Sequence, residues 1–281
     1  MLMRFIFLLV LVFANSIYLF GQVNIDSIIK SGSFLLAEKK IQKSYEPIKT
    51  TYEVTLLTEL KQYNKARSLL LKKKNRISKK TFYKLQSALD LQTSNQNNSI
   101  IDLSNELSDS TTSYEGFILF ELSRQFNSID SNLSAKHCII KSIQLLSNSR
   151  NDTIKLDQLV LFSDILSNTG KKMEALQILN SAQVLSQSDE TTLTPLKRKQ
   201  YLAAIELKKG IVFREIGKIE ESLTSLQTCD FNIHSIDKLW ALKTKSSLYQ
   251  AFQITLFIKG DKDKMFAYTI KSTLNKEIID D

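Results

Sequence analysis

Two histidines and two cysteines are the side chains of this sequence best suited to nucleophilic or metal chemistry, and their spacing fits neither. His137 and Cys138 are neighbours in a stretch with helical periodicity, where a partly buried structural role is expected. His234 lies in a predicted loop, with no Cys, His or paired acid at the spacing of a metal site. Cys229 is 91 positions from Cys138, and we expect both thiols to be buried as small hydrophobic groups.

Short motifs for cofactor or calcium binding are also missing from the sequence. The stretch Gly-Asp-Lys-Asp-Lys at 260–264 alternates its acids as a calcium loop does, but it lacks the central Gly and the closing Glu, so a turn is predicted. There is no Gly-rich phosphate loop, no Gly-x-Ser-x-Gly and no His-Glu-x-x-His. We therefore expect no enzymatic activity, no metal and no cofactor. A catalytic site assembled from scattered acids is the alternative.

The composition favours a folded, all-α chain. Of 281 residues, 43% are hydrophobic and 24% are charged, which is ordinary for a folded protein. There are only 7 Gly and 2 Pro, and β-sandwiches or barrels need turn residues every eight to twelve positions or so. An all-helical architecture needs far fewer of them.

Residues 1–21 have the layout of a secretory signal peptide. Arg4 precedes an apolar run over 5–13, and Ala14-Asn15-Ser16 fits the small-x-small pattern of a cleavage site. We predict that this segment is cleaved, leaving no stable membrane span, and that the protein is periplasmic or extracellular. An uncleaved N-terminal membrane anchor is the alternative.

An internal repeat reveals the elements that position the rest of the chain. Residues 170–182 read GKKMEALQILNSA and residues 217–229 read GKIEESLTSLQTC. Both begin with Gly-Lys, have Glu at the fifth place and Leu at the seventh and tenth, and end on a small residue. Gly can adopt the left-handed conformation that ends a helix, and residues spaced by three and four share one face of the next helix. The pattern predicts a helical hairpin with small residues where its two helices approach.

This pattern resembles the tetratricopeptide repeat family, and the same phasing extends over the chain. The matching residues are Gly210, Phe213, Gly217, Ser222, Leu226 and Cys229 in one unit, and Ser163, Leu166, Gly170, Ala175, Leu179 and Ala182 in the other. Turns are predicted near residues 32, 61, 95, 130, 170, 217 and 260. Beyond the last turn, Met265, Thr269 and Ser272 are expected to face the preceding helix. Glu206 and Lys209 depart from the pattern, because they occupy apolar places.

The resemblance implies an all-α, right-handed superhelical solenoid of about six to seven hairpins, as a single domain over residues 22–281. In such solenoids the first helices line a concave face that binds peptides or partner helices. Phe120 is then a candidate anchor and Arg124 a candidate group for orienting a carboxylate. The alternative is that the apolar members are core. The candidate groove residues are Leu85, Phe120, Arg124, Val160, Asp164, Leu207, Arg214 and Gln250.

Charge and chain organisation complete the functional prediction. The net charge is +9, but the one dense run, LKKKNRISKK at 71–80, is typical of a solvated helix end and linker, so no nucleic-acid partner is expected. The sequence predicts an exported, non-catalytic repeat protein with a protein or peptide partner. The alternative is an extracytoplasmic sensor segment of a histidine kinase or membrane-linked transcription regulator. The end of the chain after the last predicted helix, without a polar capping helix, favours that alternative.

Overall fold

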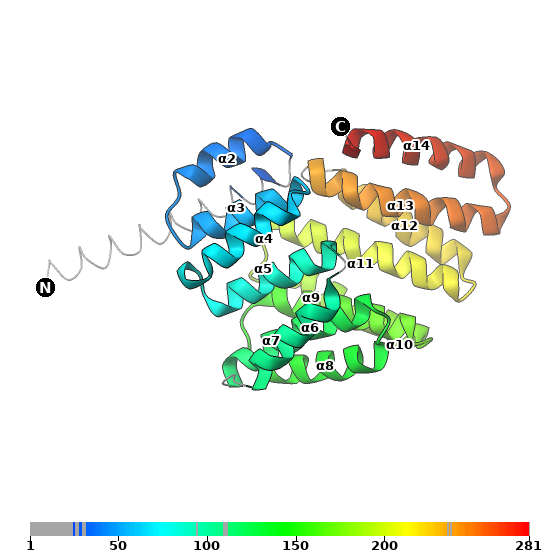
Figure 1. The fold of residues 1–281 in the computed structure, drawn as a ribbon. Helices are drawn as coiled ribbons and strands as arrows, with labels where there is room; N and C mark the ends of the chain where they lie inside the picture. The colour runs from blue at the N-terminus through cyan, green and yellow to red at the C-terminus, as the bar shows by residue number, and fades with distance from the viewer. Residues whose placement is uncertain are drawn as a thin grey trace, which may run out of the picture. The chain divides into compact units, whose positions relative to one another are not determined.

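The computed structural model describes residues 25, 28–29, 32–93, 95–108, 112–234, 236 and 238–280. These residues form α-helices and one short 3₁₀ helix, with no strand among them, so the all-α prediction is confirmed (Figure 1). The predicted signal peptide, residues 1–21, lies outside the described residues. The helices are α2 (Phe34–Gln42), α3 (Ile48–Glu59), α4 (Tyr63–Lys72), η1 (Lys74–Arg76), α5 (Lys79–Gln92), α6 (Gln96–Ser108), α7 (Thr112–Ser128), α8 (Asn132–Leu145), α9 (Asp152–Asn168), α10 (Lys172–Gln187), α11 (Pro195–Glu215), α12 (Ile219–Ile233), α13 (Lys238–Lys259) and α14 (Lys262–Asp280).

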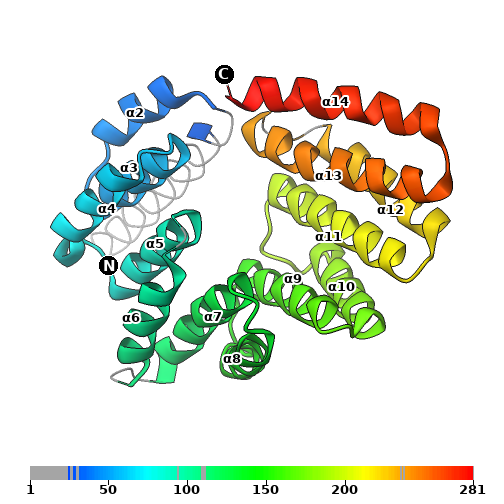
Figure 2. The same ribbon diagram turned by 45° about the vertical axis from the view of Figure 1, so that its right-hand side comes forward.

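The chain divides into two compact units, with the boundary between Leu89 and Asp90. The first unit holds α2, α3, α4 and most of α5, and the second holds α6 to α12, most of α13, and α14. Successive helices in each unit run back and forth as hairpins (Figure 2). Because both units are built from the same kind of hairpin, this division does not test the predicted single domain over 22–281, which stays a prediction.

Left-handed residues mark the turns inside the hairpins, as predicted. Four of these residues are glycines, but Lys61 and Asp130 adopt the same conformation at some steric cost. The φ angles are 77° at Gly32, 57° at Lys61, 57° at Asp130, 78° at Gly170, 79° at Gly217 and 83° at Gly260.

One backbone hydrogen bond recurs at these helix ends and fixes the register. The amide of the residue after the turn donates to the carbonyl five positions earlier, as Lys171 does to Leu166 at 2.9 Å and Lys218 to Phe213 at 2.9 Å. Asn95 donates in the same way to Asp90 at 3.0 Å. By this bond Asn95 matches Lys171 and Lys218, which each follow a turn glycine. Leu85 therefore lies one position later in its hairpin than the residues that lie ten positions before a turn.

Small residues lie where paired helices approach, which confirms the crossings predicted from the repeat. Ala175, Ala182, Ser222 and Cys229 are fully buried. A methyl group on Gly210 would lie 2.7 Å from Leu226 Cδ2. The repeat pattern thus reports close helix contact.

The two polar residues that depart from the repeat pattern are buried together. Gln183 Nε2 on α10 donates to Glu206 Oε1 at 3.1 Å, and Lys209 Nζ donates to Gln183 Oε1. Lys209 Nζ also lies 3.7 Å from Glu206 Oε1. A buried ion pair with a bridging amide therefore takes the place of apolar packing between α10 and α11.

The last helix differs from its predicted register. Thr269 is exposed, whereas Tyr268 faces inward and stacks on Phe252 of α13 with ring centroids 4.3 Å apart. Asn275 is also buried, and its Nδ2 donates to the Leu242 carbonyl at 2.9 Å. Thr269 occupies the place of the buried Leu179 and Leu226 of earlier hairpins. The Tyr268 ring therefore makes the contact with the preceding helix that a leucine makes there.

Apolar clusters in the second unit join each hairpin to the next. Leu179 and Ala182 of α10 pack with Ile205 of α11. Leu226 of α12 packs with Leu248 of α13. Since each hairpin buries its outer apolar side on its successor, the hairpins stabilise one another in sequence.

Candidate functional site

The first helices of the second unit, α7, α9, α11 and α13, carry most of the predicted groove residues. The hairpin register places one residue ten positions before each turn and another six positions before it. Residues four apart lie on the same side of a helix, so these pairs form a strip along each first helix. The pairs are Phe120 and Arg124, Val160 and Asp164, Leu207 and Ile211, and Gln250 and Ile254.

Three apolar members of this strip, Phe120, Val160 and Leu207, are half-buried and packed on the core. Phe120 lies against the cluster of Ala135, Ile139 and Ile165. Val160 packs on the α10–α11 cluster, and Leu207 packs on the α12–α13 cluster. These three side chains therefore contribute to packing while keeping part of their surface open.

The remaining predicted residues have different surroundings. Gln250 is exposed and Arg214 is half-buried. Leu85 belongs to the first unit, where it is half-buried against the cluster that includes Val54, Leu70 and Phe82. The structure thus places seven of the eight candidates in the second unit.

Charged groups sit beside the apolar strip. The Arg124 guanidinium lies 6.0 Å from the centroid of the Phe120 ring, and its Nη1 is 3.1 Å from Glu121 Oε2. Lys208 Nζ on α11 donates to both carboxylate oxygens of Asp164 on α9, at 2.6 and 2.7 Å. The second pair links neighbouring first helices and holds Asp164 at the edge of a hollow.

That hollow has a volume of about 220 Å³ and lies between α7, α9 and α11. Its rim is mostly polar, and it includes side chains near the C-terminal ends of all three first helices. The polar lining residues are Asn127, Ser163, Asp164, Ser167, Asn168, Lys208 and Glu215.

Hydrogen bonds join this rim into a row across three hairpins. Asn168 Nδ2 donates to Asn127 Oδ1 at 3.3 Å, which links α9 to α7. Ser167 Oγ lies 3.4 Å from Glu215 Oε2, which links α9 to α11, and Lys172 Nζ binds the same carboxylate oxygen. We call Asn127, Ser167, Asn168 and Glu215 the polar row.

The side chains of the polar row include both donors and acceptors: Asn127 and Asn168 have capacity beyond their mutual hydrogen bond, and Glu215 accepts. An extended peptide presents both kinds of group along its backbone, so such a row can bind main chain without reading side chains. The sequence-based prediction missed these residues because short polar side chains at helix ends are common on any surface. Their recurrence two and three positions before successive turns was the available signal.

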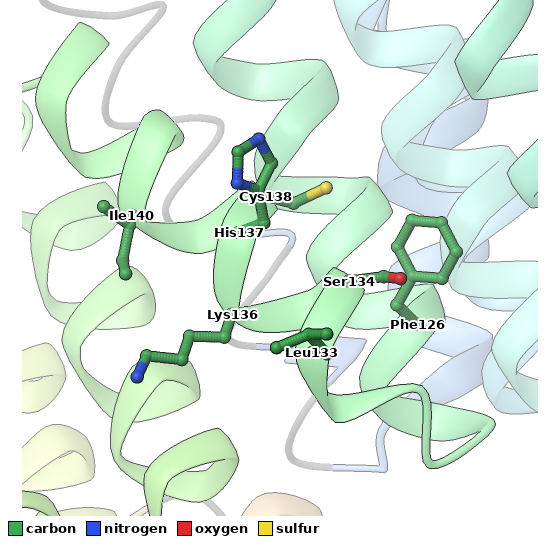
Figure 3. A pocket seen from close by; sticks show the side chains of 7 residues that line it. All are labelled: Phe126, Leu133, Ser134, Lys136, His137, Cys138 and Ile140. Atoms are coloured by element: carbon green, nitrogen blue, oxygen red, sulfur yellow. The ribbon is translucent and has the colours of Figure 1, made fainter.

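A second hollow of about 650 Å³ lies beside α8, and most of its lining residues belong to that helix (Figure 3). Cys138 and Ser134 point toward Phe126, which lies on α7, whereas Lys136 and Ile140 point the other way. The adjacent His137 is exposed, while Cys138 is buried. Burial raises the pKa of the Cys138 thiol, which disfavours the reactive thiolate.

Cys229 and Tyr201 of the second unit likewise have raised pKa values, which favour their uncharged forms. Burial, with the charges of Asp230 and Glu206, raises the pKa of Cys229 to about 12. Burial and a 2.6 Å hydrogen bond to Asp157 raise the pKa of Tyr201. Across the described part of the chain, no three His, Cys, Asp or Glu residues are grouped to hold a metal ion.

Comparisons with known proteins concern the fold. No protein-family profile matches the chain, and no curated protein matches it. Among solved structures, the chain is similar to a Rap protein in complex with Competence and Sporulation Factor, at a TM-score of 0.64 and 12% identity over 93% of this chain and 76% of that one. The likeness is one of fold. It supports a tetratricopeptide-like helical-repeat architecture, and membership of the tetratricopeptide family stays a prediction.

Proposed function

We propose that this chain is a non-catalytic, exported repeat protein that binds an extended peptide or protein segment along the first helices of its second unit. The observation that carries the proposal is the polar row across α7, α9 and α11. In this arrangement the row binds the backbone of the segment. The half-buried Phe120, Val160 and Leu207 provide apolar contacts beside it.

The solved structure with a similar fold lends support, because that Rap protein is bound to Competence and Sporulation Factor. By analogy of fold, binding of a factor suits this architecture. The chemistry of the thiols points the same way: both cysteines are buried, and their raised pKa values disfavour a nucleophilic role.

A peptide selection on the purified protein tests the binding proposal. We expect a random peptide display library to yield ligands. Asn168→Ala should lower their affinity about fivefold or more, which corresponds to the loss of about 1 kcal/mol of hydrogen bonding. The matched control is Asn180→Ala, an exposed asparagine of α10 outside the polar row. Ligands whose affinity is unchanged by Asn168→Ala, Asn127→Ala and Ser167→Ala would exclude the polar row as the site.

Export is proposed from the N-terminal sequence. Mass spectrometry of the protein from its native host should show a start near Ile17 or Gln22. An intact Met1 on a cytoplasmic protein would overturn this part of the proposal. None of the helices that the structure describes is long and apolar enough to cross a membrane.

The sensor segment of a signalling protein is the second candidate, and the last hairpin favours it. Ile254 and Phe266 occupy the places of Ile211 and Leu223, which pack against the following hairpin. Ile254 and Phe266 are 41% and 64% exposed. A further helical element therefore suits this side of α13 and α14. A gene that encodes a spanning helix and an effector domain downstream would support the sensor function.

A further inference from the structure

The positive charge of the chain is concentrated in its first unit. Residues 32–89 contain twelve Lys, two Arg, four Glu and no Asp, a net charge of +10, whereas the whole chain carries +9. The rest of the chain is therefore close to neutral. Such an asymmetry between parts of a chain points to an anionic partner for the basic part.

Several of these lysines are exposed and uncompensated. Lys39 and Lys43 lie on α2 and its C-terminal cap, and Lys65 and Lys72 lie on α4. All four are exposed, and none of them forms an ion pair with a residue that the structure describes. Glu46 shows the contrast, because it is shared by Lys73 at 3.0 Å and Arg76 at 3.7 Å.

Large apolar side chains are exposed on the same two helices. Leu35 and Leu36 on α2 are 77% and 49% exposed, and Leu71 on α4 is 59% exposed. Leu35, Lys39 and Lys43 are spaced by four and so share one side of α2. Both α2 and α4 pack on α3. We call the exposed set Leu35, Leu36, Lys39, Lys43, Lys65, Leu71 and Lys72 the basic surface.

This mixture of side chains suits a lipid surface better than a nucleic acid. Lysine is a point charge that binds phosphate without the bidentate fork of arginine, which prevails in nucleic-acid recognition. Lysines near an anionic membrane gain electrostatic attraction, and neighbouring leucines gain by entering the boundary between headgroups and acyl chains. Exposed leucines have no comparable partner on a duplex backbone.

We propose that the first unit docks peripherally on a surface of anionic, phosphate-bearing lipid headgroups through the basic surface. The lysines lie at headgroup level and Leu35, Leu36 and Leu71 reach below them. This docking is separate from the polar row of the second unit, so each can fail without the other.

Sedimentation of the full chain with lipid vesicles tests the proposal. We expect binding to vesicles of phosphatidylcholine with about a third phosphatidylglycerol, little binding to pure phosphatidylcholine, and release as salt rises from 50 to 500 mM or so. Replacing Lys39, Lys43, Lys65 and Lys72 by Gln should weaken binding at least about tenfold, since each surface lysine contributes about fivefold. Because the four side chains are exposed, the melting temperature should hold.

A matched variant separates surface binding from net charge. Replacing Lys136, Lys155, Lys199 and Lys262 of the second unit by Gln removes the same charge and should leave vesicle binding within about twofold. Leu35→Ser should weaken binding without changing its salt dependence. Equal loss in the two lysine variants would overturn the proposal. Failure to bind anionic vesicles while binding a 20-base-pair DNA duplex would also overturn it.

Discussion

The hydroxyl of Ser222 donates a 2.7 Å hydrogen bond to the backbone carbonyl of Gly210, across the close contact of α11 with α12. A similar relationship occurs two hairpins earlier in the chain, between α7 and α8, where Ser142 Oγ donates to the Gly116 carbonyl at 2.6 Å. A glycine on the first helix and a serine on the second therefore let two backbones approach and satisfy a buried hydroxyl at once.

Gly210→Ala should destabilise the protein although alanine is the better helix former. In a solvent-exposed helix, replacing Gly by Ala stabilises the fold by about 0.5 to 1 kcal/mol. Here the new methyl group would lie 2.7 Å from Leu226 Cδ2 and 3.2 Å from the Ser222 carbonyl oxygen, and overpacking costs about 1 to 3 kcal/mol. Urea unfolding should show a net loss of about 1 kcal/mol. Adding Leu226→Ala should relieve the clash, so strictly additive losses would contradict this explanation.

Ala175→Leu should lower the free energy of unfolding by about 1 to 3 kcal/mol, because Ala175 is fully buried where α10 approaches α9. The control is Gln177→Leu, at an exposed position of the same helix, which should change stability by less than about 0.5 kcal/mol. Thermal melts in which both variants are equally tolerated would refute the hairpin register.

Phe120→Ala should cost stability as well as binding. Truncation of a fully buried Phe to Ala lowers the free energy of unfolding by about 3 to 5 kcal/mol. Phe120 is half-buried against Ala135, Ile139 and Ile165, so we expect a loss of roughly 2 kcal/mol. Chemical denaturation with peptide titration measures the two effects separately. Unchanged stability with lost binding would mark Phe120 as a pure anchor, and a variant that keeps both would remove it from the site.

Lys61→Gly should stabilise the first unit by about 0.5 to 1 kcal/mol, because Lys61 adopts a φ of 57° that glycine reaches without strain. Lys65→Gly is the matched control: it removes the same charge inside α4 and should cost about 1 kcal/mol in helix propensity. Unfolding curves that rank the two variants in the opposite order would argue against strain at Lys61.

Alkaline pH should weaken the fold through Cys229. Its pKa is about 12 in the folded state, against about 8.5 in an unfolded chain. A thiol whose folded pKa is raised contributes stability that is present below the unfolded pKa and is lost as pH rises toward the folded value. Urea midpoints should therefore fall from about pH 9 upward, and Cys229→Ala should flatten that slope. An identical slope in the variant would exclude Cys229 as its cause.

The hairpins could be predicted from sequence because their turns carry strong local signals. Gly170 and Gly217 sit in matching contexts, and the small residues that follow them fall on one face of the next helix. Near Asn95 there is no glycine, and the register there was misplaced by one residue. On α14, Tyr268 and Asn275 face inward where the pattern favoured Thr269, because stacking on Phe252 decides the helix rotation.

The polar row was harder to predict because its hydrogen bonds join residues of different hairpins. Asn127 and Asn168 are 41 positions apart, and their hydrogen bond exists only once α7 and α9 are neighbours. The same holds for Asp164 and Lys208. Pairing of residues from separate hairpins depends on helix rotation to within a few tens of degrees, which periodicity alone does not fix.

The apolar clusters that link each hairpin of the second unit to the next have a consequence for how this protein comes apart. Where each element contacts its sequential neighbours, opening at one end exposes the next interface and then the one after it. Amide hydrogen exchange should therefore form a gradient, fastest in α14 and slowest in the interior hairpins. A ligand that spans α7, α9 and α11 would stabilise three hairpins at once, and it would slow amide exchange in all three together.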